Sequence, residues 1–115
     1  MLIMNKYIIE GGHPLKGTLK TSGNKNSALP CISAALLSAE PVILRNIPDI
    51  EDVRVMLSVC RALGAEVEAA GCNVWKIHAK ELTTTNIPAD LSAKLRASIL
   101  FAGSVLVRKI GRAQV

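Results

Sequence analysis

Aromatic residues are scarce in this sequence, which has one tyrosine, one tryptophan and one phenylalanine among 115 residues. Tyr7, Trp75 and Phe101 lie far apart, so aliphatic side chains and alanine must fill the interior. Proteins that bind single-stranded nucleic acid stack bases on aromatic rings beside a dense basic stripe. The net charge is +5, but the basic residues are dispersed. This pattern does not favour a nucleic-acid partner and fits an ordinary soluble protein or one with a small anionic partner, such as a phosphate-bearing metabolite.

Cysteine is also sparse, and its spacing indicates no metal site. Cys31, Cys60 and Cys72 form no C-x-x-C pair and are odd in number, so neither a disulfide framework nor a zinc site is predicted. Cys31 and Cys60 fall within apolar helical patterns, which predicts buried thiols that act as small hydrophobic side chains. We expect no metal, no cofactor and no catalytic cysteine in this chain.

Long hydrophobic runs are missing as well. The N-terminus has no charged start followed by an apolar stretch, so it does not resemble a signal peptide. The uncharged stretch Ala97–Val107 is too short to cross a bilayer. The sequence therefore predicts no membrane association and a reducing, cytoplasmic location.

The first part of the chain predicts two short strands and a helix. Lys6–Glu10 reads as a strand that ends at a glycine pair, and Thr18–Thr21 reads as a second strand. A helix is expected to follow, with Ser27 as its N-cap. This start would place Pro30 in the first turn, where proline loses no intrahelical hydrogen bond.

The middle of the chain predicts a strand over Pro41–Arg45 and a second helix. Asp49 is the expected N-cap of this helix, and Asp52 is the fourth residue of an imperfect capping box. Gly64 is the expected terminator. One helical face carries an apolar stripe, made by Val53, Met56, Leu57, Cys60 and Leu63.

A hairpin and a long helix are expected next. Ala65–Ala69 and Asn73–His78 read as strands joined by a tight turn. Pro88 then opens a helix that is expected to end near Gly111. Its predicted apolar face consists of Leu91, Leu95, Ile99, Ala102 and Leu106.

This order of elements predicts the α/β fold class (α+β in some classifications), with one βαβαββ unit and the start of a second. The pattern runs on to the last residue of the chain without a polar tail. A single unit would leave apolar faces without neighbours. We therefore expect the sequence to be the N-terminal fragment of a longer protein.

Lys25 is the strongest candidate for binding chemistry. It lies in Ser22–Ser27, a loop that leads directly into a helix N-terminus, where unpaired N–H groups attract anions. A cation is locally unfavourable at this end of a helix dipole, and a bound phosphate or carboxylate would remove the penalty. The alternative is that Lys25 points into water. The glycine spacing does not match the phosphate loop of nucleotide-binding proteins.

Arg96 is the second candidate, because it lies in a mostly apolar helical stretch. A buried guanidinium there would need a partner, and its planar fork suits a phosphate. The alternative is that its stem lies along apolar surface while its head reaches water. His13 and His78 show no catalytic partner by spacing, and helix capping explains the acidic cluster around Asp49.

Several ordered motifs resemble one known family. The run Ser22–Pro30 closely resembles the opening motif of the UDP-N-acetylglucosamine 1-carboxyvinyltransferase family, a branch of the enolpyruvyl transferases. Asn46–Val53 resembles the family's strand-to-helix turn, and Leu63–Ala65 resembles the helix end that follows. Leu95–Ile99 resembles its Met-Arg-Ala-Ser motif with leucine in place of methionine, and Gly111–Val115 resembles the segment before its catalytic loop.

The resemblance implies a fold of repeated βαβαββ units in which each domain is an inside-out α/β barrel. It implies that residues 1–21 form a strand pair that packs with a second domain, and that residues 22–115 form an incomplete first domain. It also implies that Lys25 contacts phosphoenolpyruvate, that Asn26 helps to position substrate and that Arg96 contacts the UDP-sugar. These three are the only site residues that it suggests in this chain.

The implied reaction adds the 3-hydroxyl of UDP-N-acetylglucosamine to carbon 2 of phosphoenolpyruvate and then releases phosphate, in peptidoglycan precursor synthesis. In the family the acid, the base and further arginines lie beyond this chain, so we expect the 115 residues alone to be inactive. Two alternatives stay open: a stand-alone, non-catalytic anion-binding or interaction module, and the sister enzyme that acts on shikimate 3-phosphate.

Overall fold

A small antiparallel sheet forms the base of the molecule. The computed structural model describes residues 5–84, 86–94 and 99–108. The sheet contains β1 (Val42–Leu44), β2 (Glu66–Gly71) and β3 (Val74–His78) in the order β1-β3-β2. Both outer strands run antiparallel to β3. The central strand β3 therefore pairs with β1 on one side and with its hairpin partner β2 on the other.

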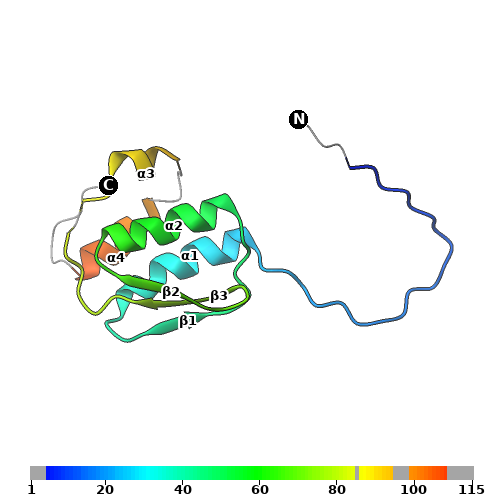
Figure 1. The fold of residues 1–115 in the computed structure, drawn as a ribbon, viewed down its shortest axis with the longest axis horizontal. Helices are drawn as coiled ribbons and strands as arrows, with labels where there is room; N and C mark the ends of the chain where they lie inside the picture. The colour runs from blue at the N-terminus through cyan, green and yellow to red at the C-terminus, as the bar shows by residue number, and fades with distance from the viewer. Residues whose placement is uncertain (1–4, 85, 95–98, 109–115) are drawn as a thin grey trace.

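Helices cover one side of this sheet (Figure 1). α1 (Lys25–Ala34) continues into a 3₁₀ turn, η1 (Ala35–Leu37), and α2 (Glu51–Ala62) packs beside α1. α2 also contacts β2, and η1 contacts β3. The core lies between these layers, and its fully buried large side chains include Ile32, Leu36, Met56, Leu57, Leu63, Ile77 and Phe101.

The apolar stripe of the second predicted helix is confirmed in α2. Its members Val53, Met56, Leu57, Cys60 and Leu63 are all buried. The helix ends where predicted, because Gly64 adopts a φ of 108°, which glycine accepts without strain. The predicted cap is wrong: Ile50 is the N-cap residue and makes no side-chain cap bond. Asp49 instead accepts hydrogen bonds from the guanidinium of Arg54, at 2.8 and 3.1 Å.

α1 begins earlier than the sequence predicts. Asn24 is its N-cap, and the Asn24 side chain accepts a 2.7 Å hydrogen bond from the backbone N–H of Asn26. Pro30 consequently lies inside the helix, beyond the first turn. The predicted cap, Ser27, forms part of the helix itself. The Asn24 cap compensates for part of the lost bonding, since asparagine is among the best N-cap residues.

The predicted hairpin is confirmed, with a turn shifted by one residue. Cys72 and Asn73 form the turn between β2 and β3, and Asn73 adopts a φ of 56°. Two polar contacts connect residues that face each other across these strands. Lys76 forms an ion pair with Glu68 at 3.5 Å, and Nδ1 of His78 lies 3.8 Å from the Glu66 carboxylate. The carboxylate partner of His78 was not evident from sequence spacing, because it lies on the neighbouring strand.

The long helix expected after Pro88 has a different form in the described residues. They show α3 (Ala89–Lys94) and α4 (Phe101–Arg108). The predicted apolar face is wrong at Leu106 of α4, which is 47% exposed, and at Ile99, which lies just ahead of α4 and is 60% exposed. Phe101, Ser104 and Val105 are buried instead. The bulk of Phe101 occupies the core and sets which side of the helix faces inward.

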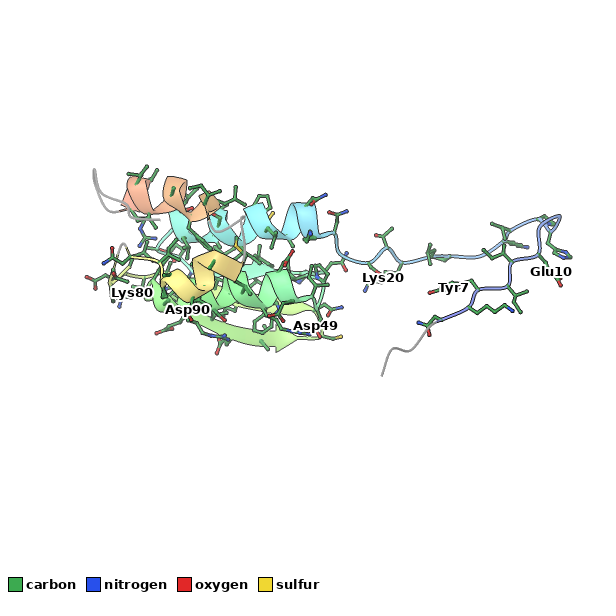
Figure 2. All side chains as sticks on the ribbon, turned by 90° about the horizontal axis from the view of Figure 1, so that it is seen from above. Tyr7, Glu10, Lys20, Asp49, Lys80 and Asp90 are labelled. Atoms are coloured by element: carbon green, nitrogen blue, oxygen red, sulfur yellow. The ribbon has the colours of Figure 1, made fainter. Side chains whose placement is uncertain are left out.

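Residues 5–20 extend away from the body as an open segment (Figures 1 and 2). The strands predicted over Lys6–Glu10 and Thr18–Thr21 are not formed here. A strand needs a neighbour for its backbone hydrogen bonds, and this segment has none among the described residues. Its apolar side chains are exposed: Tyr7, Ile8, Ile9, Leu15 and Leu19. The proposed assignment of residues 1–21 to a second domain stays a prediction.

The predicted fold class is confirmed. Helices and strands alternate through β3 in the order helix, strand, helix, strand, strand, which matches a βαβαββ unit without its first strand. The prediction of a further strand after Gly111 falls on residues outside the described part of the chain.

Candidate anion site at the start of α1

The loop before α1 brings the first helical turn close to α2. Gly23 makes this possible, because a Cβ there would overlap the carbonyl oxygen of Asn46 and lie 2.8 Å from Cδ of Pro48. The side-chain amide of Asn46 also donates a 3.3 Å hydrogen bond to the Thr21 carbonyl. The loop is therefore packed tightly on the segment that leads from β1 into α2.

Lys25 is the first residue of α1 and reaches across to α2. Its Nζ lies 3.2 Å from Oδ2 of Asp52, the second residue of α2. The two side chains are 51% and 33% exposed. Lys25 is thus neither buried nor simply directed into water, but forms an ion pair at the surface between two helix starts.

Of the other two predicted site residues, the structure describes Asn26 but not Arg96. Asn26 follows Lys25 in the first turn of α1 and is exposed. Arg96 lies outside the described residues, so its expected contact with the UDP-sugar stays a prediction. Sequence reasoning missed Asp52, which it assigned to helix capping. No sequence pattern pairs it with Lys25, because the two residues belong to separate helices.

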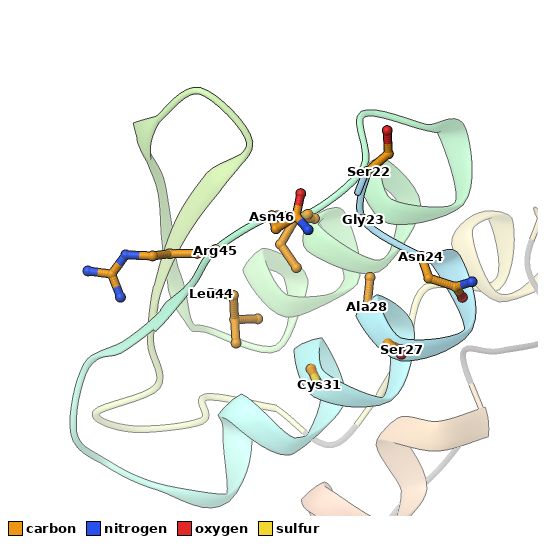
Figure 3. Close-up of a pocket in the computed structure, with 10 residues that line it drawn as sticks. Ser22, Gly23, Asn24, Ser27, Ala28, Cys31, Leu44, Arg45 and Asn46 are labelled. Carbon is orange, nitrogen blue, oxygen red and sulfur yellow. The ribbon is translucent and has the colours of Figure 1, made fainter. Parts of the chain in front are cut away.

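A pocket of about 340 Å³ lies on the other side of the same loop (Figure 3). Ala28 and Cys31 of α1 face Leu44 across it, and Arg45 points away from α1. Neither Lys25 nor Asn26 belongs to its lining. Lys25 and Asn26 are therefore separate from this pocket. The full lining is Ser22, Gly23, Asn24, Ser27, Ala28, Cys31, Leu44, Arg45, Asn46 and Ile47.

The cysteines differ from one another in exposure. Cys31 and Cys72 are exposed, so the predicted burial is wrong for Cys31. Cys31 lies on the side of α1 that lines the pocket, away from the core. Cys60 is buried, as predicted, and burial raises the pKa of its thiol from 9.0 to about 12, an effect that the nearby charge of Arg61 partly opposes.

Metal-binding clusters and membrane-spanning helices are both absent from the described residues. They contain no group of three or more histidine, cysteine, aspartate or glutamate side chains that could hold a metal ion. None of the helices among them has the length and apolarity to cross a bilayer. What the α1 start offers chemically is a cation, the first-turn N–H groups that the Asn24 cap does not occupy, and a neighbouring carboxylate.

Comparisons with known proteins all point to 1-carboxyvinyltransferases. The family model for EPSP synthase (3-phosphoshikimate 1-carboxyvinyltransferase) matches residues 9–112. The chain is 59% identical over 105 residues to UDP-N-acetylglucosamine 1-carboxyvinyltransferase of Treponema denticola, and 51% identical over 105 residues to the protein of that name from Treponema pallidum. Both alignments cover 91% of this chain and 25% of the relative, so the chain spans about a quarter of the length of these relatives.

A solved structure agrees with the sequence relatives. The enolpyruvyl transferase NikO from Streptomyces tendae superposes with a TM-score of 0.72 at 30% sequence identity, over 86% of this chain and 23% of that protein. The match supports the α/β arrangement described above. Because the family model covers nearly the whole sequence and the solved structure shares its fold, the chain belongs to the EPSP synthase family of enolpyruvyl transferases.

Proposed function

We propose that this chain forms part of an enzyme that transfers the enolpyruvyl group of phosphoenolpyruvate to the 3-hydroxyl of UDP-N-acetylglucosamine, in the cytoplasmic synthesis of peptidoglycan precursors. The observation that carries the proposal is the 59% identity to the Treponema denticola relative of that name. The match to the EPSP synthase model alone would not distinguish a UDP-sugar from shikimate 3-phosphate as the acceptor.

The start of α1 supports a role in holding negative charge. Phosphoenolpyruvate carries a carboxylate and a phosphate, and negative charge must be stabilised while the tetrahedral intermediate forms and phosphate leaves. The Lys25 ammonium lies at the positive end of α1, whose first N–H groups have no partner within the helix. In the proposal Lys25 binds phosphoenolpyruvate, while Asn26 positions substrate and Arg96 binds the UDP-sugar.

A hybrid enzyme tests the proposed function. This chain replaces the corresponding quarter of the Treponema denticola relative, and phosphate release from phosphoenolpyruvate is measured with either acceptor. We expect turnover with UDP-N-acetylglucosamine, none with shikimate 3-phosphate, and none by the 115-residue chain alone. Turnover with shikimate 3-phosphate would identify the sister enzyme. A folded hybrid that uses neither acceptor, beside an active intact relative, would favour a non-catalytic binding module.

Replacing Lys25 in this hybrid tests its role directly. Lys25→Ala should lower kcat/KM for phosphoenolpyruvate by about a hundredfold or more, the usual cost of losing a charge-stabilising donor. Lys76→Ala is the matched control, because Lys76 is also a partly exposed lysine paired with a carboxylate, but on the sheet. Equal kinetics for the Lys25→Ala and parent hybrids would remove Lys25 from the site.

A further inference from the structure

The ion pair between Lys25 and Asp52 connects the N-terminus of α1 to the N-terminus of α2. Lys25 is the first residue of α1 and Asp52 is the second residue of α2, and their charged atoms lie 3.2 Å apart. Within the described part of the chain, no other ion pair or hydrogen bond involves either charged group. The family assignment does not by itself explain this contact.

Stability is a poor explanation for the pair. Ion pairs at comparable exposure contribute little to the free energy of unfolding. Lys25 also lies at the positive end of its helix dipole, where a cation is disfavoured. The carboxylate of Asp52 is favoured at the start of α2 by the same effect. Asp52 is therefore well placed without Lys25, whereas Lys25 needs a carboxylate near it.

Both backbones are held firmly beneath this contact. On α2, the neighbouring Val53 is 1% exposed and Met56 is fully buried, so the first turn of the helix is anchored in the core. On α1, the Asn24 cap and the close approach at Gly23 fix the loop that carries Lys25. The remaining freedom lies in the lysine side chain itself, which samples many rotamers when it is unrestrained.

We propose that Asp52 is a positioning residue that holds the Lys25 ammonium ready for an anionic substrate group. This inference rests on the proposed function of Lys25. An ammonium has three N–H donors, so one can bind Asp52 while two remain for a phosphate or carboxylate. Asp52 touches no substrate in this arrangement. Its role is to reduce the ordering that Lys25 must undergo when substrate binds.

The kinetic test uses Asp52→Asn in the hybrid enzyme. We expect kcat/KM for phosphoenolpyruvate to fall about tenfold to a hundredfold, as for misplacement of a binding group, with KM for UDP-N-acetylglucosamine unchanged. Asp52→Glu keeps the charge and should recover part of the loss. Glu51→Gln is the control, because Glu51 lies on the same turn, pairs with Arg54 and does not pair with Lys25.

The outcomes separate this inference from the proposed function. If the parent hybrid turns over and Lys25→Ala impairs it while Asp52→Asn has no effect, the inference is overturned and the function stands. If Asp52→Asn lowers the melting temperature and Asp52→Glu recovers no activity, Asp52 is merely structural and the inference also fails.

A chemical test in the 115-residue chain does not depend on turnover. Reductive methylation with formaldehyde, followed by peptide mass spectrometry, measures the reaction rate of each lysine. Asp52→Asn should speed modification of Lys25 about two- to fivefold, the range expected for loss of an exposed ion pair, and leave Lys76 unchanged. Equal rates at Lys25 in both proteins would mean that the pair does not hold the ammonium, which overturns the inference even if the hybrid is inactive.

Discussion

The buried thiol of Cys60 makes the stability of the fold depend on pH. The side chain lies on the inner face of α2 and is fully buried. Loss of solvation disfavours its thiolate and raises its pKa to about 12. The two exposed cysteines, Cys31 and Cys72, lie outside the core. Above pH 9 the thiol of Cys60 ionises readily in the unfolded chain but stays protonated in the folded one.

This difference predicts a loss of stability at alkaline pH. The contribution of Cys60 to the free energy of unfolding is complete below pH 9 and falls as the pH rises toward 12. Denaturant unfolding of the parent and of Cys60→Ala from pH 8 to 11 measures it. The free energy of unfolding of the parent should fall more steeply with pH. The extra slope should correspond to about one more proton released on unfolding per molecule. Parallel curves for the two proteins would contradict the buried, neutral thiol.

At the scale of elements, Arg108 connects the end of α4 to the rest of the fold. Its guanidinium donates to the carbonyl oxygens of Leu36 and Ala79, each at 2.7 Å. It also donates to those of Ser38 at 3.0 Å and Lys80 at 3.2 Å. These acceptors lie in or directly after η1 and directly after β3, so one side chain holds three elements together, with no acidic partner among the described residues.

Replacing Arg108 should therefore destabilise the chain. Arg108→Met keeps the length of the stem and removes the donors, and we expect it to lower the free energy of unfolding by about 1 to 3 kcal/mol. Arg61→Met is the matched control: Arg61 also ends a helix, but it makes a single 3.3 Å bond to Val67. Its effect should stay within about 0.5 kcal/mol. Equal losses in both variants, measured by urea unfolding, would refute the special role of Arg108.

Periodic elements were predictable and contacts between elements were not. The stripe from Val53 to Leu63 predicted α2, because burial of one helical face leaves a regular signal in the sequence. The predicted inner face of α4 was wrong, since Leu106 and Phe101 are both apolar and only packing decides which one is buried. In the site, the loop and Lys25 could be predicted from helix-start chemistry. Asp52 could not, because its contact depends on how two helices pack.

At the scale of the whole molecule, the chain has a packed body and an exposed extension. All described residues before Gly23 are exposed. The buried side chains of α1, α2 and β3, in contrast, form one hydrophobic cluster. Figure 2 shows Tyr7, Glu10 and Lys20 along the extension, away from the helices. Backbone without secondary structure or burial is the most accessible to proteases.

Limited trypsin digestion tests this division. Cleavage after Lys6, Lys16 and Lys20 should precede cleavage after Arg54 and Arg61 of α2. Mass spectrometry would then find an early product that begins at Thr21, and the circular dichroism spectrum should retain its helical signal. Early cleavage within α2 would mean that the body is not the stable unit of this chain.

The tight packing at Gly23 has a mechanical consequence. Because the backbone there leaves no space for even a methyl group against Asn46 and Pro48, the α1 loop and the entry to α2 cannot slide past each other. A rotation of the extension relative to the body must then take place ahead of Ser22. During such a rotation, the ammonium of Lys25 and the carboxylate of Asp52 would keep their positions relative to each other, because both lie on the body side of the contact.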